Sequence, residues 1–350
     1  MRAEALFVSI VVPTYNRRTS LQRLLRALGE QAVAATRFEV VIVDDGSTDG
    51  TIETVRAMAL PYDCLVIEQA HQGPAAARNL GVARARGRLV LFLDDDVVPH
   101  AGLLARHVAA HLAHQHAVVI GPMRPPRDWV RPAWVRWEED LLQIQYRELV
   151  AGKYPCTPRQ FYTANASLPR DLFLRAGGFD PTFRRAEDVE FAFRLRDLGA
   201  RFIFEPQAEV MHYASRSFAA WSQTPYQYGR YDVLMERQKG HETLACAAVE
   251  FHQRHPFTRT LVHLCLGRPR LSHRMVPLLG AGARLAEGLR CRPVANAILS
   301  GAFNLRYWQG VSDELGGAGQ VWRLIAAAAG RPAPDVTLPR STHTAGVIGG

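Results

Sequence analysis

The chain has 350 residues and a formal net charge of +9 at pH 7. This length accommodates one large domain with an appendage. No apolar run reaches the ~18 residues of a membrane span, and five cysteines without a Cys-x-x-Cys pair argue against a disulfide framework or a zinc site. Because the first residues also lack a signal-peptide pattern, we expect a protein of the reducing cytoplasm.

The excess of positive charge is concentrated in the last third of the chain. From His241 to Gly350 there are twelve arginines and six acidic residues. A basic region of this kind can attract an anionic membrane surface or a nucleic acid, although a solvated surface rich in arginine has the same composition. The composition by itself therefore leaves a peripheral contact with the cytoplasmic face of a membrane open.

Apolar strands and amphipathic helices alternate in the first quarter of the chain. Strands are expected at residues 7–12, 39–43, 64–67 and 88–93, with a helix in each interval. In the first helix Leu21, Leu24, Leu25 and Leu28 lie on one face. Alternation of this kind predicts a parallel, doubly wound sheet with right-handed crossovers.

The following elements are less uniform. After Pro99 a helix is expected to run through Leu103, Val108 and Leu112, and a strand should follow at 117–121. The proline-rich segment 123–159 is predicted to be irregular. A second apolar block starts at Phe161, a helix covers 187–198, and extended segments cover 201–204 and 208–213. Residues from 216 onward are predicted to be mostly helical, and 331–350 a disordered tail.

Acidic residues recur in three clusters, which are Asp44-Asp45, Asp94-Asp95-Asp96 and Glu187-Asp188. The first two clusters directly follow apolar strands, and the carboxyl ends of such strands form the ligand-binding edge of open α/β sheets. Like charges in one place require a cation to neutralise them. A divalent metal that carries phosphate oxygens meets this need, so the clusters predict an enzyme that handles an activated nucleotide.

The ordered motifs of the chain resemble those of the family 2 glycosyltransferases. The matching blocks are VVPTYN (11–16), VDDGSTD (43–49), ARNLG (77–81), FLDDD (92–96), GGFD (177–180), Glu187-Asp188 and His212. A single short motif would be weak evidence, but seven in order are hard to produce by chance. The resemblance covers about residues 7–215 and implies the GT-A fold, a nucleotide-binding αβα sandwich.

This resemblance also implies a domain organisation. It predicts a catalytic domain over 1–215, with a nucleotide-binding half at about 1–121 and an acceptor-side half at about 122–215. A basic helical extension would follow at 216–330.

The resemblance further implies a role for each motif residue. It assigns donor binding to Pro13, Thr14, Tyr15, Asp44, Asp45, Arg78, Asp94, Asp95, Asn165 and Glu187. Among these, Thr14 and Tyr15 would contact the nucleobase, and Asp45, ahead of Asp44, would accept from its imino N–H. The catalytic base would be Asp188, because such a base must reach an acceptor hydroxyl opposite the leaving diphosphate. Asp96 and His212 would bind a divalent metal, Mn²⁺ or Mg²⁺.

Structural explanations compete with several of these roles. The Asp45-Gly46-Ser47 sequence also favours an Asx turn, and Arg78 can equally be an arginine paired with an aspartate. Glu187 can simply complement a helix dipole, and a lone histidine such as His212 is usually structural. The tryptophan–arginine segment 127–137 fits an acceptor-sugar platform, a membrane contact or plain packing.

The sequence thus predicts an inverting, metal-dependent glycosyltransferase. It would move a sugar from a nucleoside diphosphate donor, UDP first among them, to a hydroxyl of a saccharide or lipid-linked acceptor in polysaccharide or glycoconjugate synthesis. A nucleotidyltransferase of the same fold is the alternative, although residues 13–17 lack the glycine-rich loop it would need. An inactive scaffold would have no need for the carboxylates, a nucleic-acid binder does not explain them, and a processive synthase would carry membrane spans.

Overall fold

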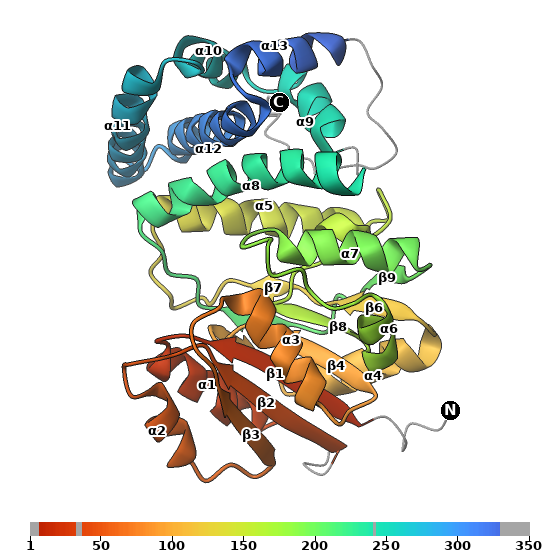
Figure 1. Cartoon of the computed structure of the whole chain (residues 1–350). Helices are drawn as coiled ribbons and strands as arrows, with labels where there is room; N and C mark the ends of the chain where they lie inside the picture. Colours follow the sequence, from red (N-terminus) through yellow and green to blue (C-terminus); the bar gives the residue numbers. More distant parts are fainter. Residues whose placement is uncertain (1–6, 33–36, 241–242, 330–350) are drawn as a thin grey trace. The chain divides into compact units, whose positions relative to one another are not determined.

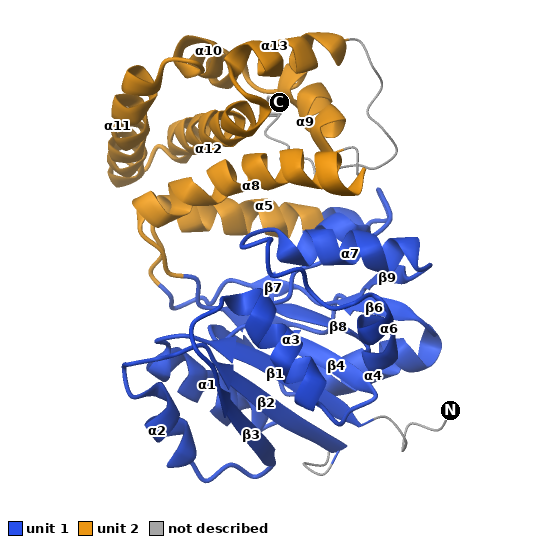
Figure 2. Cartoon of the chain, in the orientation of Figure 1, with its two compact units in different colours: residues 1–129, 146–214 blue, residues 130–145, 215–350 orange. Residues whose placement is uncertain are grey.

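The computed structural model describes residues 7–32, 37–240 and 243–329 (Figure 1). The chain forms two compact units (Figure 2). Unit 1 comprises residues 1–129 and 146–214, and unit 2 comprises residues 130–145 and 215–350. The segment 331–350, for which the sequence predicts a disordered tail, lies outside the described residues.

Unit 1 is built on a seven-stranded sheet with the strand order β3-β2-β1-β4-β8-β6-β9. The first four strands are β1 (Val8–Thr14), β2 (Phe38–Asp44), β3 (Asp63–Glu68) and β4 (Leu89–Leu93). All of them run parallel, which confirms the predicted doubly wound half. Their register places Thr14 beside Asp44, so the ends of β1 and β2 meet at one edge.

The other half of the sheet is mixed. Strand β8 (Asn165–Pro169) runs antiparallel to β4 and to β6 (Ala117–Ile120), and β9 (Arg201–Phe204) runs parallel to β6. A small second sheet has the order β5 (Val97–Pro99), β10 (Val210–His212) and β7 (Met123–Arg124). In this sheet His212 pairs with Val97, so the end of unit 1 returns beside the residues that follow β4.

Helices cover the main sheet. One apolar cluster joins the strands to residues of α3 (Pro74–Arg84), α6 (Arg170–Arg175) and α7 (Glu187–Asp197). Helix α3 approaches the sheet closely at Gly81, where an added Cβ would lie 2.5 Å from Cγ1 of Val11. A glycine is therefore required at this position of the ARNLG motif, and the approach brings Arg78, one turn earlier, to the sheet edge.

The predicted helix after Pro99 is present as α4 (Leu103–Ala113), and its buried face includes two histidines. The helix buries Leu103 and Ala110 together with His107 and His111, whereas Val108 and Leu112 are only partly buried. The imidazoles are accommodated because the Ser167 hydroxyl on β8 lies 2.7 Å from Nδ1 of His107 and 2.8 Å from Nε2 of His111. Burial lowers the pKa of His107 to about 4 and that of His111 to about 3, so both stay neutral at pH 7.

The prediction of an irregular segment over 123–159 was wrong. Residues Ala133–Val150 form α5, a helix of 18 residues. Its prolines bracket the helix instead of interrupting it: Pro132 directly precedes the first residue, and Pro155 lies beyond the last. A proline at a helix start removes no hydrogen bond, because the first N–H groups have no intrahelical partner.

Unit 2 is helical, as predicted. Its helices are α8 (Phe218–Lys239), α9 (Thr243–His252), α10 (Pro256–Cys265), α11 (Pro269–Gly288), α12 (Arg292–Leu315) and α13 (Ala318–Ala327), joined by the first part of α5. Trp137, Trp221 and Phe303 form an aromatic cluster in its core. Within the described part of the chain, no helix combines the length and the apolar character that crossing a membrane requires.

Candidate functional site

Three consecutive carboxylates after β4 have three different partners. Nη2 of Arg78 donates to Oδ1 of Asp94 at 2.7 Å. The Thr14 hydroxyl donates to Oδ2 of Asp95 at 2.7 Å, and Nε2 of His212 lies 3.5 Å from Oδ1 of Asp96. The triplet therefore spreads toward α3, β1 and β10. Asp95 is the most buried of the three, with Asp94 and Asp96 on either side.

Asp95 is held inside unit 1. Its burial, together with the charges of Asp96 and Asp94, raises its pKa to about 7, although the hydrogen bond from Thr14 opposes the shift. Thr14 is itself buried, and its hydroxyl serves Asp95. The Thr14 side chain thus faces the acidic triplet, and its contact with a nucleobase stays a prediction.

Arg78 links the acidic triplet to the start of α7. Its Nη1 donates to Oε1 of Glu187 at 3.0 Å while Nη2 binds Asp94, and the residue is only 4% exposed. Burial acts to lower the pKa of Arg78, but the carboxylates of Asp94 and Glu187 prevail and raise it above its ordinary value. A permanently charged arginine therefore connects two of the three acidic clusters.

Backbone geometry sets the direction of the Glu187-Asp188 pair. The preceding residue, Ala186, has φ 58° in the left-handed region, which is uncommon for a residue with a Cβ and costs roughly 1 kcal/mol. Helix α7 begins directly after it, so Glu187 turns to Arg78 while Oδ1 of Asp188 accepts from the N–H of Val189 at 2.8 Å. Conformational strain of this kind is commonly found at functional sites.

The carboxyl of Asp188 has an unusual environment. Burial and the adjacent Glu187 raise its pKa to about 7, against the opposing charge of Arg78. A carboxyl with a pKa near neutrality is a stronger base than an ordinary aspartate and is still largely ionised above pH 7. This basicity is compatible with the proton abstraction that the sequence predicts for Asp188, and that role stays a prediction.

The two carboxylates of the first acidic pair bind different loops. Asp44 stabilises the turn after β2, because its carboxylate accepts from the N–H of Ser47 at 3.0 Å and from the Ser47 hydroxyl. Asp45 instead binds the loop between β3 and α3: it accepts from Gln69 Nε2 at 2.7 Å and from the N–H groups of Gln72 and Gly73 at 2.8 Å. The side-chain hydrogen bonds that stabilise this turn thus come from Asp44 and not from Asp45.

His71 completes the surroundings of Asp45. Its Nδ1 lies 2.9 Å from Oδ2 of Asp45, and its ring lies 4.5 Å from the ring of Tyr15, centroid to centroid. Both aromatic side chains are largely exposed. The imidazole thus packs against the Tyr15 ring at a tilt of 34° and contacts the Asp45 carboxylate, the two side chains that the sequence predicts at the nucleobase. The sequence analysis did not single out His71, because its only local signal is its place in the loop before Gly73-Pro74.

Asn165 lies beside the site but points away from it. Strand β8 pairs Asn165 with Leu93, the residue before Asp94. Its amide is buried, donates to the Ala208 carbonyl at 2.7 Å and lies 3.0 Å from Nε2 of His107 on α4. The structure therefore does not bring this side chain to the carboxylates, because the alternation of β8 directs Asn165 and Ser167 to the α4 side.

Two tryptophans of the segment 127–137 pack in the interior, and one does not. Trp134 and Trp137 are buried in unit 2, which agrees with the packing explanation. Trp129 belongs to unit 1 and meets Tyr213 edge to face with ring centroids 5.3 Å apart. Since Tyr213 follows His212 and donates its N–H to the carbonyl of Asp96 at 2.9 Å, Trp129 lies near the Asp96–His212 pair.

The Asp96–His212 pair suits a divalent cation whose other ligands are phosphate oxygens of a substrate. No set of three or more His, Cys, Asp or Glu side chains suited to hold a metal occurs in residues 7–32, 37–240 and 243–329. One carboxylate and one imidazole leave most coordination positions of Mn²⁺ or Mg²⁺ to other oxygens, as is usual where substrate phosphates supply them. The donor set therefore fits a metal bound together with a diphosphate.

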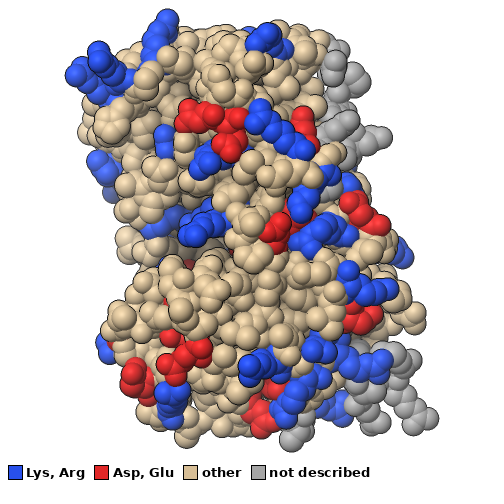
Figure 3. All heavy atoms as spheres, in the orientation of Figure 1, with Lys and Arg blue, Asp and Glu red and all other residues tan. Residues whose placement is uncertain are grey.

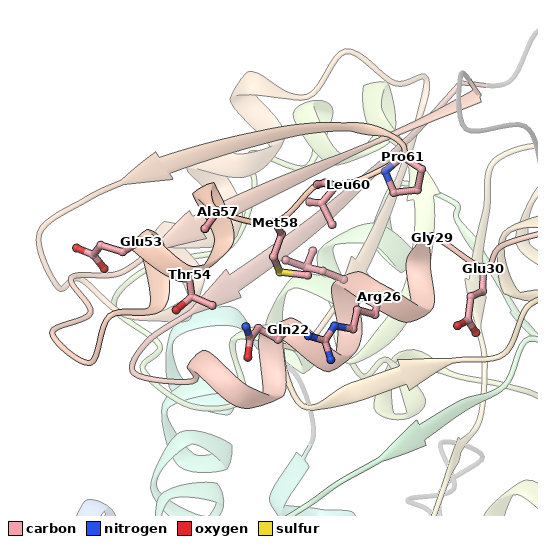
Figure 4. Close-up of a pocket in the computed structure, with 12 residues that line it drawn as sticks. Gln22, Arg26, Gly29, Glu30, Glu53, Thr54, Ala57, Met58, Leu60 and Pro61 are labelled. Carbon is pink, nitrogen blue, oxygen red and sulfur yellow. The ribbon is translucent and has the colours of Figure 1, made fainter.

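A separate hollow of about 940 Å³ lies between α1 (Arg18–Leu28) and α2 (Thr51–Arg56) (Figure 4). Gln22, Arg26, Glu53 and Met58 are among the residues that line it. It shares no residue with the carboxylate cluster, and its charged side chains do not converge on one point in Figure 4. It is not part of the candidate site.

The fold and the carboxylates at the sheet edge define a GT-A type of α/β protein. S. aureus TarS in complex with UDP is similar, with a TM-score of 0.53 and 20% identity over 89% of this chain and 92% of the TarS chain. The mannosyltransferase PcManGT from Pyrobaculum calidifontis, in complex with GDP-Man and Mn²⁺, has a TM-score of 0.53 and 20% identity over 93% of this chain and 79% of that chain. At this identity the likeness shows the fold.

Sequence comparison gives a family match over part of the chain. Residues 9–174 match the model of Glycosyl transferase family 2. A relative, glycosyltransferase AglE from Haloferax volcanii, is 41% identical over 200 residues, which are 57% of this chain and 64% of AglE. The chain therefore spans less than two thirds of this relative's length.

Proposed function

We propose that the protein is an inverting glycosyltransferase that moves a sugar from a nucleoside diphosphate donor to an acceptor hydroxyl. The observation that carries this proposal is the buried Arg78, which joins Asp94 of the donor-side triplet to Glu187, the neighbour of the base Asp188. Glycosyl transfer requires the residues that bind the donor diphosphate and the base that takes the acceptor proton to lie close together. Arg78 contacts residues next to both of these groups. The match of residues 9–174 to a glycosyltransferase family supports the same chemistry.

The donor side consists of two groups of residues. Asp45 and Tyr15 would contact the nucleobase in the place that the His71 imidazole takes here, with Asp45 accepting from an imino N–H of a base such as uracil. Asp96 and His212 would hold Mn²⁺ or Mg²⁺, which when bound neutralises the charge that develops on the leaving diphosphate. Asp94, fixed by Arg78, would face the ribose or the sugar. UDP-sugars are the first donors to test.

Asp188 would act as the general base. As the acceptor oxygen forms its bond to the anomeric carbon, the hydroxyl proton passes to the Asp188 carboxylate and the bond from that carbon to the diphosphate oxygen breaks. The nucleoside diphosphate leaves on the face opposite the attack, so the configuration inverts. Partial burial of Asp188 and the adjacent Glu187 raise the pKa of this carboxyl and thus its basicity, which supports this role.

The acceptor is proposed to be a hydroxyl of a saccharide or of a lipid-linked saccharide. Trp129 is partly exposed near the Asp96–His212 pair and is an aromatic side chain suited to stack on a sugar ring. The neighbouring Tyr213 ring already has the Arg23 guanidinium over it, 4.1 Å from its centroid. We further propose that residues 1–215 form the catalytic domain and that the helical residues from 216 onward serve the acceptor side or a peripheral membrane contact.

The test begins with nucleotide binding. The purified chain is melted with UDP, GDP or dTDP, each with Mn²⁺ and with EDTA. One nucleotide should raise the melting temperature only in the presence of metal, and Asp96→Asn should abolish this increase. Sugar transfer or hydrolysis from the matching donor should then be observed in the wild type and lost in Asp188→Asn, which should retain nucleotide binding. Release of pyrophosphate from a nucleoside triphosphate and a sugar phosphate would instead favour the nucleotidyltransferase.

A further inference from the structure

Helix α11 carries a line of leucines on its surface. Leu271, Leu278 and Leu285 are spaced by seven residues, and Leu289 follows four residues later at the end of the helix. Residues at these intervals lie on one side of a helix. The leucines are 38%, 63%, 66% and 72% exposed, respectively. We call these four side chains the leucine stripe.

The packing of α11 does not require the leucine stripe. The helix contacts the rest of unit 2 through a different side, on which Leu279, Ala283 and Ala286 are buried. At Gly280 the Phe218 ring lies so close that an added Cβ would be 2.6 Å from it. The helix thus has a complete inner face made mainly of small residues, and the stripe is additional apolar surface. Phe257 and Leu264 of the preceding helix α10 are also exposed.

The charges around the leucine stripe are almost all of one sign. Exposed arginines in this part of the chain are Arg259, Arg270, Arg274, Arg284, Arg290 and Arg292. Between residues 255 and 294 Glu287 is the only acidic residue, and it forms an ion pair with Arg136. None of the six arginines makes an ion pair with another side chain among the described residues. Figure 3 shows blue and tan but no red spheres along the upper left margin, where Figure 1 places α11.

We propose that α11 docks unit 2 onto an anionic lipid surface, with the leucine stripe inserted among the acyl chains and the flanking arginines at the phosphates. An interfacial helix of this type combines apolar insertion with attraction to anionic lipids. The charge pattern disfavours a second copy of this chain as the occupant, because an α11–α11 contact would oppose arginine with arginine. A lipid surface also accepts an uninterrupted row of leucines without a complementary groove.

The test is sedimentation of the full chain with vesicles in the absence of any donor or acceptor. Vesicles of phosphatidylcholine with phosphatidylglycerol are compared with phosphatidylcholine alone. The wild type should bind the anionic vesicles at least tenfold more tightly, and more weakly at high salt. Leu278→Glu/Leu285→Glu should reduce this binding at least tenfold. Arg274→Gln should reduce it about fivefold, the effect expected for one surface charge.

A matched control separates the stripe from exposed leucines in general. Leu174 on α6 is 51% exposed in unit 1, and Leu174→Glu should leave vesicle binding unchanged. All variants should keep the melting temperature of the wild type, because each changed side chain faces solvent. Absence of binding to anionic vesicles, or equal binding by the double variant, would overturn the proposal.

Light scattering tests whether a second copy of this chain, instead of a lipid surface, covers the leucine stripe. A wild-type dimer that Leu278→Glu/Leu285→Glu converts to a monomer, without vesicle binding, would assign the stripe to a second copy and also overturn the proposal. None of these measurements uses catalysis, so their failure would leave the proposed glycosyl transfer untouched, and loss of transfer would leave the membrane contact untouched.

Discussion

The carboxyl edge of the sheet in unit 1 and the α11 face of unit 2 use charge in opposite ways. At the sheet edge, Arg78 is buried and fixed by Asp94 and Glu187 at hydrogen-bonding distance. On α11, exposed arginines such as Arg274 and Arg284 surround apolar side chains without any acidic partner in contact. Buried, paired charges fix the positions of reacting groups, whereas exposed charges of one sign attract an extended surface. The difference separates a candidate site for chemistry from a candidate site for docking.

Asp188 provides the largest expected effect in unit 1. Asp188→Asn should reduce sugar transfer by roughly 10³-fold, within the range that general bases contribute, while nucleotide-dependent stabilisation persists. The measurement is initial rate with the donor identified by melting. Asp197→Asn, at the other end of the same helix and exposed, is the control and should keep full activity. Unchanged transfer in Asp188→Asn would remove the base from the proposal.

The same variant should be more stable than the wild type. The pKa of Asp188 is about 7 in the folded protein against an ordinary value of 3.8, so the folded state resists ionisation of this group. The wild type therefore loses stability relative to Asp188→Asn as pH rises from about 4 to 7. Above pH 7 the variant should be ahead by on the order of 2 kcal/mol. Urea unfolding at pH 4, 6 and 8 measures the difference, and a gap that does not change with pH would contradict the assignment.

Arg78 and Arg175 sharpen the comparison between buried and exposed pairs. Arg78→Met should destabilise unit 1 by about 3 kcal/mol, because it leaves two carboxylates without their cation in a buried place. Arg175→Met removes an exposed pair with Asp171 at 3.7 Å and should cost less than about 0.5 kcal/mol. Chemical denaturation of both variants checks this. Equal losses of unfolding free energy in the two variants would show that the burial of Arg78 does not add to the stability that its ion pairs contribute.

His71 should give the smallest effect. Its imidazole already packs against the Tyr15 ring and contacts Asp45, so a nucleobase that takes this place must displace it. His71→Ala should therefore tighten binding of the nucleoside diphosphate by a few-fold, whereas Tyr15→Ala should weaken it. Titration calorimetry with the two variants measures both changes. Weaker binding by His71→Ala would mean that the imidazole stacks on the base and does not compete with it.

The sequence alone determined the parallel half of the sheet and the place of the acidic clusters. Strands β1 to β4 are short apolar runs, each ended by polar residues, and their local pattern suffices to define them. The order of motifs such as VDDGSTD and FLDDD, which is also a local property, was sufficient to recognise the family.

Only the tertiary structure decided which side chains meet. Arg78 contacts Glu187, which lies 109 positions away in the sequence, only because α3 and α7 pack together. The contacts of Asp94, Asp95 and Asp96 with three different elements likewise depend on long-range packing. The burial of His107 depends on polar groups of β8, and the outward direction of Asn165 from the site depends on strand alternation. The sequence specifies each element through its nearest neighbours, but the contacts of a polar side chain are set by elements that lie far away along the chain.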